Sequence, residues 1–233
     1  MKTNQRNIIS FVGAFIVLCA LTGCKPSSEQ QARVAEQRRE HDLNTILPTD
    51  PDANIDTTKY VRLKRGGKFF IAPREYFQQG NMHGFYWPSK TPKFTSNSNY
   101  PERSAVAAGK IDTVEIAFQL ESSNAEGGTY GVLQKAAQEG VVIERETIRD
   151  GLDKVKRANQ RGMPIYVATN LKTPSGEPPA LSCDERGGGH AGTSGFVWKK
   201  DLRIYVSFSA NHCKDWPEIY TEIIRVLNLV KEA

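Results

Sequence analysis

The sequence contains few of the residues and patterns from which catalytic and metal sites are built. Its 233 residues include four histidines, scattered along the chain, and four cysteines. Neither the HExxH motif of zinc proteases nor a phosphate-binding P-loop occurs. We therefore predict no metal ion, no cofactor and no enzymatic activity. Calcium stays open as an alternative through the acidic segment 50–56, although this segment lacks the glycine of an EF-hand loop.

A strong excess of one charge is also absent. The formal net charge is +5, and removal of Lys2 and Arg6 with an N-terminal signal lowers it by two, to +3. Nucleic-acid-binding domains usually carry a much larger and clustered positive charge. The composition therefore argues against a nucleic-acid partner.

The N-terminal hydrophobic run is too short for a transmembrane helix. Ile8–Leu21 is an uncharged run of 14 residues that follows Lys2 and Arg6. A helix needs about 20 apolar residues to cross a hydrocarbon core of roughly 30 Å. A short apolar run behind positive residues is typical of a secretory signal peptide, so we predict that the chain is exported.

The run ends in Leu21-Thr22-Gly23-Cys24, which resembles the lipobox of bacterial lipoproteins. The resemblance implies cleavage before Cys24, acylation of its thiol and anchoring of the chain to a membrane in the periplasm. Lys25 stands where the inner-membrane retention signal would have aspartate, which favours the periplasmic leaflet of the outer membrane. The alternative is an ordinary secretory signal with an incidental cysteine.

The predicted organisation has three parts. Residues 1–23 form the signal peptide, 24–58 a lipidated flexible tether, and 59–233 a globular domain. The tether is rich in Ser, Gln, Glu and Arg, then in Pro and Asp, and has too few apolar residues to build a core. Two similar sub-domains, one per hairpin, are an alternative, although the sequence shows no convincing internal repeat.

Two cysteines remain once the signal is removed and Cys24 is acylated. Cys183 and Cys213 would lie in an oxidising compartment, where a disulfide between them is the simplest outcome. A metal site is the alternative, because His190 and His212 are close in sequence, but the spacing of a structural zinc site is missing.

Hydrophobic periodicity predicts an α+β fold, with an antiparallel sheet of hairpins and helices packed on one face. The predicted strands are a hairpin over 60–71 with a Gly-Gly turn, the segments 113–120 and 164–169, and a hairpin over 196–208. The predicted helices cover 130–139, 144–160 and a C-terminal amphipathic segment that begins at Asp215. The stretch 80–101 is expected to be mostly loop.

The C-terminal helix has a clear start signal and a clear apolar stripe. Asp215 stands at the capping position, with Glu218 at the capping-box position. The stripe consists of Ile219, Ile223, Val226, Leu227 and Val230. We expect this stripe to pack on the sheet.

Two segments are candidates for binding a partner. Phe85, Tyr86 and Trp87 form an aromatic run in the predicted loop, and exposed aromatic residues are frequent anchors at interfaces. Alternatively, Phe85 and Trp87 close one edge of the core while Tyr86 faces solvent. The second candidate is His190, in the glycine-rich loop 187–195 beside the predicted disulfide.

The same glycine-rich loop offers the sequence's only hint of catalysis. His190 and Ser194 lie in it, and Asp184 is nearby, so a hydrolytic triad is conceivable. The G-x-S-x-G spacing of a nucleophile elbow is missing. A loop with ordinary polar residues is the favoured interpretation.

The C-terminal region, Cys183–Val230, is similar to immunity lipoproteins of type VI secretion systems, including those that neutralise phospholipase effectors. The similarity consists of a cysteine-containing loop, the strand Leu202–Phe208, and Asp215-Trp216 at the start of a terminal helix. It implies a protein that binds and inhibits a secreted toxin in the periplasm, with that toxin as its partner. It assigns a role to no individual residue. The alternative is a structural or assembly lipoprotein of the cell envelope.

Overall fold

The computed structural model describes most of the chain after residue 54. The described residues are 55–65, 68–77, 83–94, 111–120, 128–158, 162–186, 190–192, 195–199 and 202–233. The predicted signal peptide, Cys24 and the tether up to residue 54 lie outside them. All described elements belong to one compact unit, Asp42–Ala233. No helix within the described ranges is long and apolar enough to cross a membrane.

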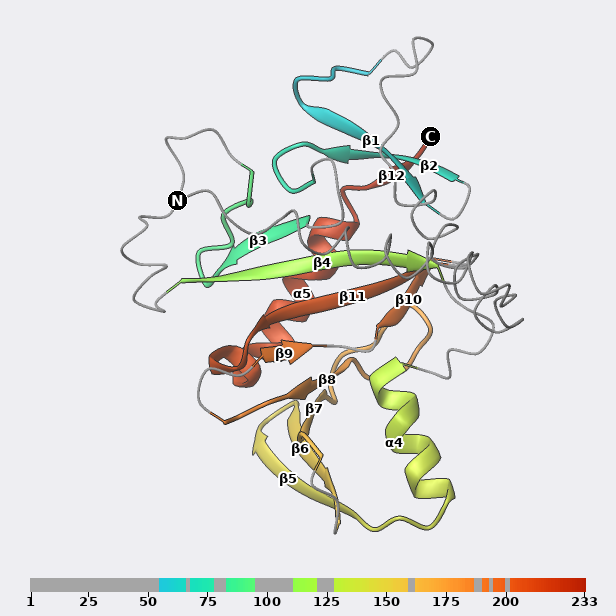
Figure 1. Cartoon of the computed structure of the whole chain (residues 1–233), viewed down its shortest axis with the longest axis vertical. Helices are drawn as coiled ribbons and strands as arrows, with labels where there is room; N and C mark the ends of the chain where they lie inside the picture. Colours follow the sequence, from blue (N-terminus) through green and yellow to red (C-terminus); the bar gives the residue numbers. More distant parts are fainter. Residues whose placement is uncertain are drawn as a thin grey trace, which may run out of the picture. The chain divides into compact units, whose positions relative to one another are not determined.

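A small antiparallel sheet holds the first strands and the C-terminus. It consists of β1 (Tyr60–Arg65), β2 (Lys68–Pro73) and β12 (Lys231–Glu232), in the order β1-β2-β12 (Figure 1). The hairpin predicted over 60–71 is thereby confirmed, with Arg65 opposite Lys68 at its end. The backbone N–H of Ala233 donates to the carbonyl of Phe69, which ties the end of the chain to this sheet.

A larger antiparallel sheet forms the body of the domain. Its strands are β3 (His83–Trp87), β4 (Asp112–Leu120), β5 (Ile143–Arg149), β6 (Leu152–Arg157), β7 (Ile165–Ala168), β8 (Ala180–Cys183), β9 (His190–Gly192), β10 (Phe196–Lys199) and β11 (Leu202–Ser209). They follow the order β3-β4-β11-β9-β8-β7-β6-β5, and β10 also pairs with β11. The antiparallel α+β class is confirmed, as are the strands predicted over 113–120 and 164–169 and the hairpin over 196–208.

Two α-helices accompany the sheets. Helix α4 (Gly128–Gln138) confirms the helix predicted over 130–139. Helix α5 (Trp216–Leu227) follows a 3₁₀ segment, η2 (Ala210–Asp215). The predicted stripe, consisting of Ile219, Ile223, Val226, Leu227 and Val230, is buried throughout, and Val230 lies just after the end of α5. These side chains belong to the main hydrophobic cluster, together with residues of both sheets.

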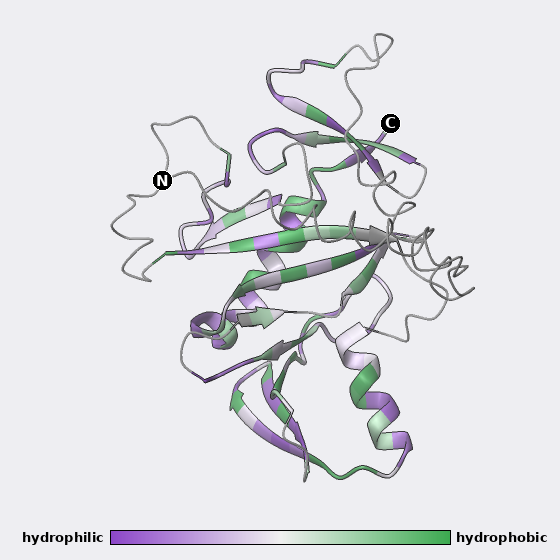
Figure 2. Ribbon diagram, in the orientation of Figure 1, coloured by the Kyte–Doolittle hydropathy of each residue, from purple (hydrophilic) through white to green (hydrophobic). Residues whose placement is uncertain are grey.

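The two helices contribute to different hydrophobic clusters. In β7, Ile165 and Val167 cluster with Leu133 of α4, whereas Tyr166 and Ala168 belong to the main cluster that includes α5. Successive side chains of a strand point to opposite faces, so the helices cover opposite faces of this part of the sheet. The prediction that both helices pack on one face is therefore wrong. In β7 both faces carry apolar side chains, so each face must pack against another element. In β4 and β11, by contrast, polar and apolar residues alternate along the strand (Figure 2).

The segment 144–160, predicted as a helix, is mainly the β5–β6 hairpin. Arg149 pairs with Leu152, which leaves Asp150 and Gly151 as the turn. Gly151 has φ +74°, in the left-handed region that favours glycine. Leu152 and Val155, which share a stripe on a helix, belong here to the two different clusters. The helical spacing was therefore misleading, because the two side chains serve opposite faces of the sheet.

The stretch 80–101 contains a strand where a loop was predicted. All five residues of β3 are buried, including His83 and Gly84. The strand pairs with β4 from His83 opposite Ile116 to Trp87 opposite Asp112. A strand buried on both sides lacks the alternation of polar and apolar residues that marks a half-exposed strand. The usual sequence signal was therefore missing.

Candidate functional site

A disulfide joins the end of β8 to η2. The sulfur atoms of Cys183 and Cys213 are 2.04 Å apart and their Cα atoms 6.4 Å apart, which is the pairing that the sequence predicts. Both residues are buried. The bond fixes the segment that precedes α5 against the larger sheet. The described residues contain no group of three or more His, Cys, Asp or Glu side chains placed to hold a metal ion.

The carboxylate of Asp215 is the centre of a polar cluster beside this disulfide. Its Oδ2 atom accepts a hydrogen bond from Trp87 Nε1 at 3.0 Å and lies 3.0 Å from His212 Nδ1. A carboxylate only accepts hydrogen bonds, so Nδ1 of His212 carries the proton in this contact. Trp87 comes from β3, so the cluster connects one edge of the larger sheet to the start of α5.

The predicted capping box at Asp215 is wrong in its chemistry, although the position is right. Asp215 is the residue that precedes α5, but its side chain makes no capping hydrogen bond. Glu218 instead accepts a 2.5 Å hydrogen bond from Arg149, whose guanidinium also donates to the carbonyl of Lys214. The carboxylates of Asp215 and Glu218 therefore accept hydrogen bonds from side chains of β3, β5 and η2, in place of the expected capping hydrogen bonds at the start of α5.

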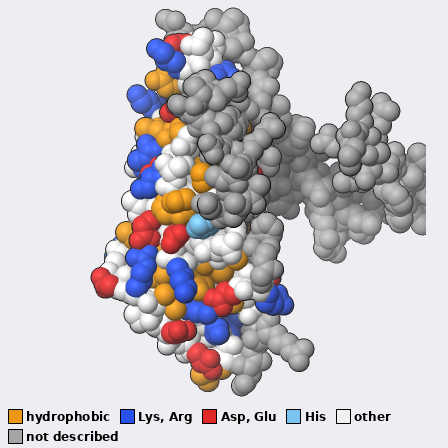
Figure 3. All heavy atoms as spheres, turned by 90° about the vertical axis from the view of Figure 1, so that its left-hand side faces the viewer, with side chains coloured by type: hydrophobic (Ala, Val, Ile, Leu, Met, Phe, Trp, Pro, Cys, Tyr) orange, Lys and Arg blue, Asp and Glu red, His pale blue; other side chains and the backbone are white. Residues whose placement is uncertain are grey.

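A hollow of about 290 Å³ opens beside the first turn of α5. It is lined by residues that follow β3, by the β5–β6 turn, by residues that follow β7 and by α5: Lys90, Asp150, Gly151, Asn170, Leu171, Pro217, Glu218 and Thr221. Acidic, basic and hydrophobic side chains are mixed on the side of the molecule where η2 lies (Figure 3). The hollow thus combines apolar walls from Leu171 and Pro217 with carboxylates from Asp150 and Glu218.

Lys90 holds an unusual conformation at this hollow. Its φ is +59°, and among the described residues it is the only one other than glycine with positive φ. Its Nζ atom lies 5.8 Å from the centre of the Trp87 ring. A left-handed conformation costs a residue with a Cβ about 1 kcal/mol or more. Lys90 therefore links the hollow to the indole that binds Asp215.

The lining residues combine carboxylates, a lysine, a hydroxyl and apolar groups. They include no histidine or cysteine, and the Thr221 hydroxyl donates to the carbonyl of Pro217 at 2.8 Å. The hydroxyl of Thr221 therefore donates to a backbone carbonyl and not to a base that would activate it as a nucleophile. The arrangement can receive a side chain that has an apolar stem and a polar or positive end.

The sequence left two interpretations of the aromatic run, and the exposed binding anchor is the wrong one. Phe85 is 0% exposed, Tyr86 8% and Trp87 6%. Phe85 and Trp87 belong to the main hydrophobic cluster, as the alternative interpretation expects, but Tyr86 is buried as well and does not face solvent. The correction follows from β3 being a paired strand. Trp87 still serves the site, through the hydrogen bond of its indole.

The second predicted binding residue and the conceivable triad are only partly described. The backbone of His190 lies in β9 opposite Ser209, while its side chain and Ser194 lie outside the described residues. The Asp184 carboxylate binds the Arg186 guanidinium at 2.7 and 3.1 Å, and these hydrogen bonds hold the pKa of Asp184 below its usual value. Asp184 is thus engaged with a neighbouring arginine.

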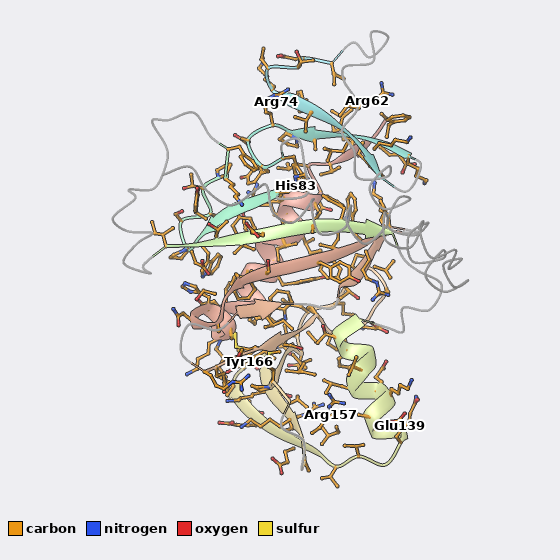
Figure 4. All side chains as sticks on the ribbon, in the orientation of Figure 1. Arg62, Arg74, His83, Glu139, Arg157 and Tyr166 are labelled. Carbon is orange, nitrogen blue, oxygen red and sulfur yellow. A yellow bond between two sulfur atoms is a disulfide. The ribbon has the colours of Figure 1, made fainter. Side chains whose placement is uncertain are left out.

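A second polar cluster, absent from the sequence predictions, joins β6 and β7 to the residues that follow β8. Glu185 accepts hydrogen bonds from Tyr166 Oη at 2.5 Å and from Lys154 Nζ at 2.7 Å. Burial and the hydrogen bond to Glu185 raise the pKa of Tyr166, which Figure 4 labels. Burial favours a higher pKa for Glu185, but the bonds from Lys154 and Tyr166 hold it below the usual value. Lys154 lies opposite Tyr166 only because this segment is a strand.

No protein-family model, curated protein or solved structure matches this chain.

Proposed function

We propose that this chain is a membrane-tethered periplasmic immunity protein that binds and inhibits a secreted antibacterial toxin, in particular a phospholipase effector. It acts by binding, without catalysis of its own. The lipobox-like N-terminus and the similarity of the C-terminal region to immunity lipoproteins support this proposal. The structural observation that carries it is the hollow at the start of α5, which is braced by contacts from several parts of the chain.

A rigid surface favours tight inhibition. The disulfide attaches η2 to β8, Trp87 attaches β3 to Asp215, and Arg149 attaches β5 to the first turn of α5. A surface that is already ordered loses little conformational entropy when a partner binds. The site therefore supports binding without rearrangement of the described elements.

The chemistry of the hollow indicates what it would accept. Asp150 contributes a carboxylate, Glu218 contributes a second one that is already bound by Arg149, and Leu171 and Pro217 contribute apolar contacts. An arginine or lysine of the toxin matches this combination, because its stem packs on apolar groups while its end binds a carboxylate. Such a side chain, inserted into a pocket, is a typical anchor of a protein interface.

The proposed lipid on Cys24 fits a target that works at the membrane. Attachment to the periplasmic leaflet of the outer membrane would confine the inhibitor to a surface. Confinement raises its effective concentration against an enzyme that attacks the same surface. The anchor is thus part of the proposed mechanism.

The test begins with the toxin, sought by pull-down from periplasm with mass spectrometry and as the product of the neighbouring gene. Wild-type protein should co-purify with the toxin and inhibit it. Asp150→Lys should weaken toxin binding at least tenfold, because it places a cation where the proposed partner cation binds. Glu139→Lys, the same charge change at an exposed position after α4, should leave binding unchanged.

Two results would contradict the proposal. One is a chain that neither co-purifies with a toxin nor protects cells from it. The other is a deletion strain whose envelope fails in a culture that contains no toxin, which would favour the structural lipoprotein. Equal affinities of Asp150→Lys and wild type would leave inhibition intact but place the interface elsewhere.

A further inference from the structure

Strand β5 is the last strand at one end of the larger sheet, and no described residue pairs with its outer edge. The sheet order ends in β7-β6-β5, so β5 has a neighbouring strand on one side only (Figure 1). The consecutive residues Glu144–Thr147 of this strand are exposed. An exposed strand edge carries backbone N–H and C=O groups that can pair with a strand of another chain.

The chain itself closes the opposite end of this sheet. The N–H of Tyr86 in β3 donates to the carbonyl of Thr91 at 2.8 Å. The N–H of Gly84 donates to the carbonyl of Tyr76 at 3.0 Å, and the carbonyl of Gly84 accepts from the N–H of Lys93 at 3.1 Å. All residues of β3 are also buried. Of the two end strands, β5 is therefore the one whose outer edge stays open in the described part of the chain.

The register of the β5–β6 hairpin decides which backbone groups point outward. Val142 and Ala158 lie one step beyond the first pair of the ladder, and the N–H of Ala158 donates to the carbonyl of Val142 at 2.8 Å. Hydrogen-bonded and non-hydrogen-bonded pairs alternate along an antiparallel ladder. Glu144 therefore bonds to β6, whereas the N–H and C=O groups of Ile143 and Arg145 point away from it. These four groups are the outer edge that a partner strand could use.

The charges of β5 disfavour a second copy of this chain as the partner. In a two-fold symmetric antiparallel pair, one residue lies opposite itself. A pair centred on Glu144 or Glu146 brings two carboxylates together, and a pair centred on Arg145 brings two guanidinium groups together. Like charges that lie directly opposite each other destabilise strand pairing. A bulge between Thr147 and Arg149 then ends the regular part of the edge.

The charges of β5 instead match a partner strand that carries basic residues. Glu144 and Glu146 are both exposed and point to the same side of the strand. Lys154 lies opposite Glu146 in the ladder, but its ammonium group binds Glu185 at 2.7 Å. A partner with lysine or arginine at two positions, two residues apart, would place a cation beside each of the two carboxylates.

The outer edge of β5 leads into the hollow at the start of α5. Arg149, the last residue of β5, binds Glu218 of α5. Asp150 and Gly151, in the turn that follows, line the hollow. A protein with a side chain in the hollow would therefore lie next to the open edge.

We propose that an extended segment of the toxin pairs with the outer edge of β5 and places basic residues beside Glu144 and Glu146. The outward groups of Ile143 and Arg145 hydrogen-bond to the backbone of this segment, which supplies affinity, and the two carboxylates select its side chains. This inference rests on the proposed function, because the toxin is the partner. It adds the backbone pairing by which the toxin is held.

The test follows amide hydrogen exchange by NMR in the mature chain 24–233 with Cys24→Ser, which cannot be acylated. The chain is measured alone and in complex with the toxin encoded by the neighbouring gene. In the free chain, the amides of Ile143 and Arg145 should exchange much faster than that of Glu144, which bonds to β6. In the complex, exchange at Ile143 and Arg145 should slow by about tenfold or more, because each amide gains a hydrogen bond.

Two substitutions at one position separate the backbone group from the side chain. Arg145→Pro removes an outward N–H, which an edge strand tolerates, and should weaken toxin binding about tenfold. Arg145→Ala keeps the N–H and loses the 3.2 Å ion pair with Asp153, so it should bind nearly as well as wild type. Thermal unfolding of both variants shows whether they fold.

A second pair of variants leaves the backbone intact. Glu144→Gln/Glu146→Gln should weaken toxin binding about fivefold and reduce its salt dependence, because two exposed ion pairs with the partner are lost. Glu75→Gln/Glu139→Gln removes the same charge at exposed positions outside β5 and should leave binding unchanged.

The outcomes distinguish the edge pairing from the proposed function. An inhibited toxin complex in which Ile143 and Arg145 exchange as fast as in the free chain would overturn the pairing and leave the proposed function standing. Equal weakening by Arg145→Pro and Arg145→Ala would also overturn it. A dimer of the free chain that Arg145→Pro disperses would make a second copy the partner. A wild-type chain that binds no toxin would refute the proposed function and the pairing together.

Discussion

Removal of the Cys183–Cys213 disulfide should destabilise the domain strongly. The bond joins residues 30 positions apart, and cross-linking a loop of that length removes roughly 12 cal/mol/K of entropy from the unfolded chain. This corresponds to about 3.6 kcal/mol at 25 °C. With a urea m-value of about 2 kcal/mol/M, reduction should lower the unfolding midpoint by about 1.8 M. For a domain of this size the thermal midpoint should fall by about 10 °C.

The assay compares urea unfolding of the Cys24→Ser chain with and without dithiothreitol, and of Cys183→Ala/Cys213→Ala. Reduction keeps both sulfur atoms, whereas the double variant also removes buried atoms, so it should be less stable than the reduced chain by the cost of a small cavity. Dithiothreitol should not affect the double variant. Identical midpoints for the oxidised and reduced chains would refute the argument that this bond holds η2 and the site in place.

Three further substitutions, one of them a control, test local features of the structure. Gly151→Ala should cost about 2 kcal/mol, because the residue has φ +74° and its Cβ would lie 2.9 Å from Asn170 Nδ2. Gly140→Ala, with φ +76° and open space around it, should cost only about 1 kcal/mol, and equal losses in urea unfolding would argue against the close approach. Glu185→Gln should cost about 1 kcal/mol at pH 7, because it weakens the bonds from Lys154 and Tyr166. Since the folded-state pKa of Glu185 is below its usual value of 4.5, this stability is present above pH 4.5 and disappears as the pH falls through the folded value. A pH-independent difference between wild type and Glu185→Gln would contradict the assignment.

Elements marked by strictly local patterns were predictable. The hairpin 60–71 and the strand 113–120 alternate in hydropathy, and the C-terminal helix has an apolar stripe from Ile219 to Val230. Each of these patterns reflects one buried face, and its period depends only on the local backbone. The hairpin 143–157 was missed because its apolar residues serve two faces, which produced a false helical spacing.

The candidate site was less predictable than the fold, because its contacts join distant parts of the chain. Trp87 and Asp215 are 128 residues apart, and Arg149 and Glu218 are 69 apart. Local pattern correctly marked Asp215 as the residue before a helix. It could not show that the Asp215 carboxylate is hydrogen-bonded to an indole from β3 and an imidazole from η2. The expected capping hydrogen bond was therefore wrong.

By itself, the sequence determined the antiparallel α+β class, several strands, both helices and the pairing of Cys183 with Cys213. These features depend on periodicity and on the small number of cysteines. Only the tertiary structure decided that the aromatic run is buried, that the helices cover opposite faces, and that a hollow opens beside α5. Those features depend on which strands become neighbours, and the order β3-β4-β11-β9-β8-β7-β6-β5 brings together segments that no local pattern connects.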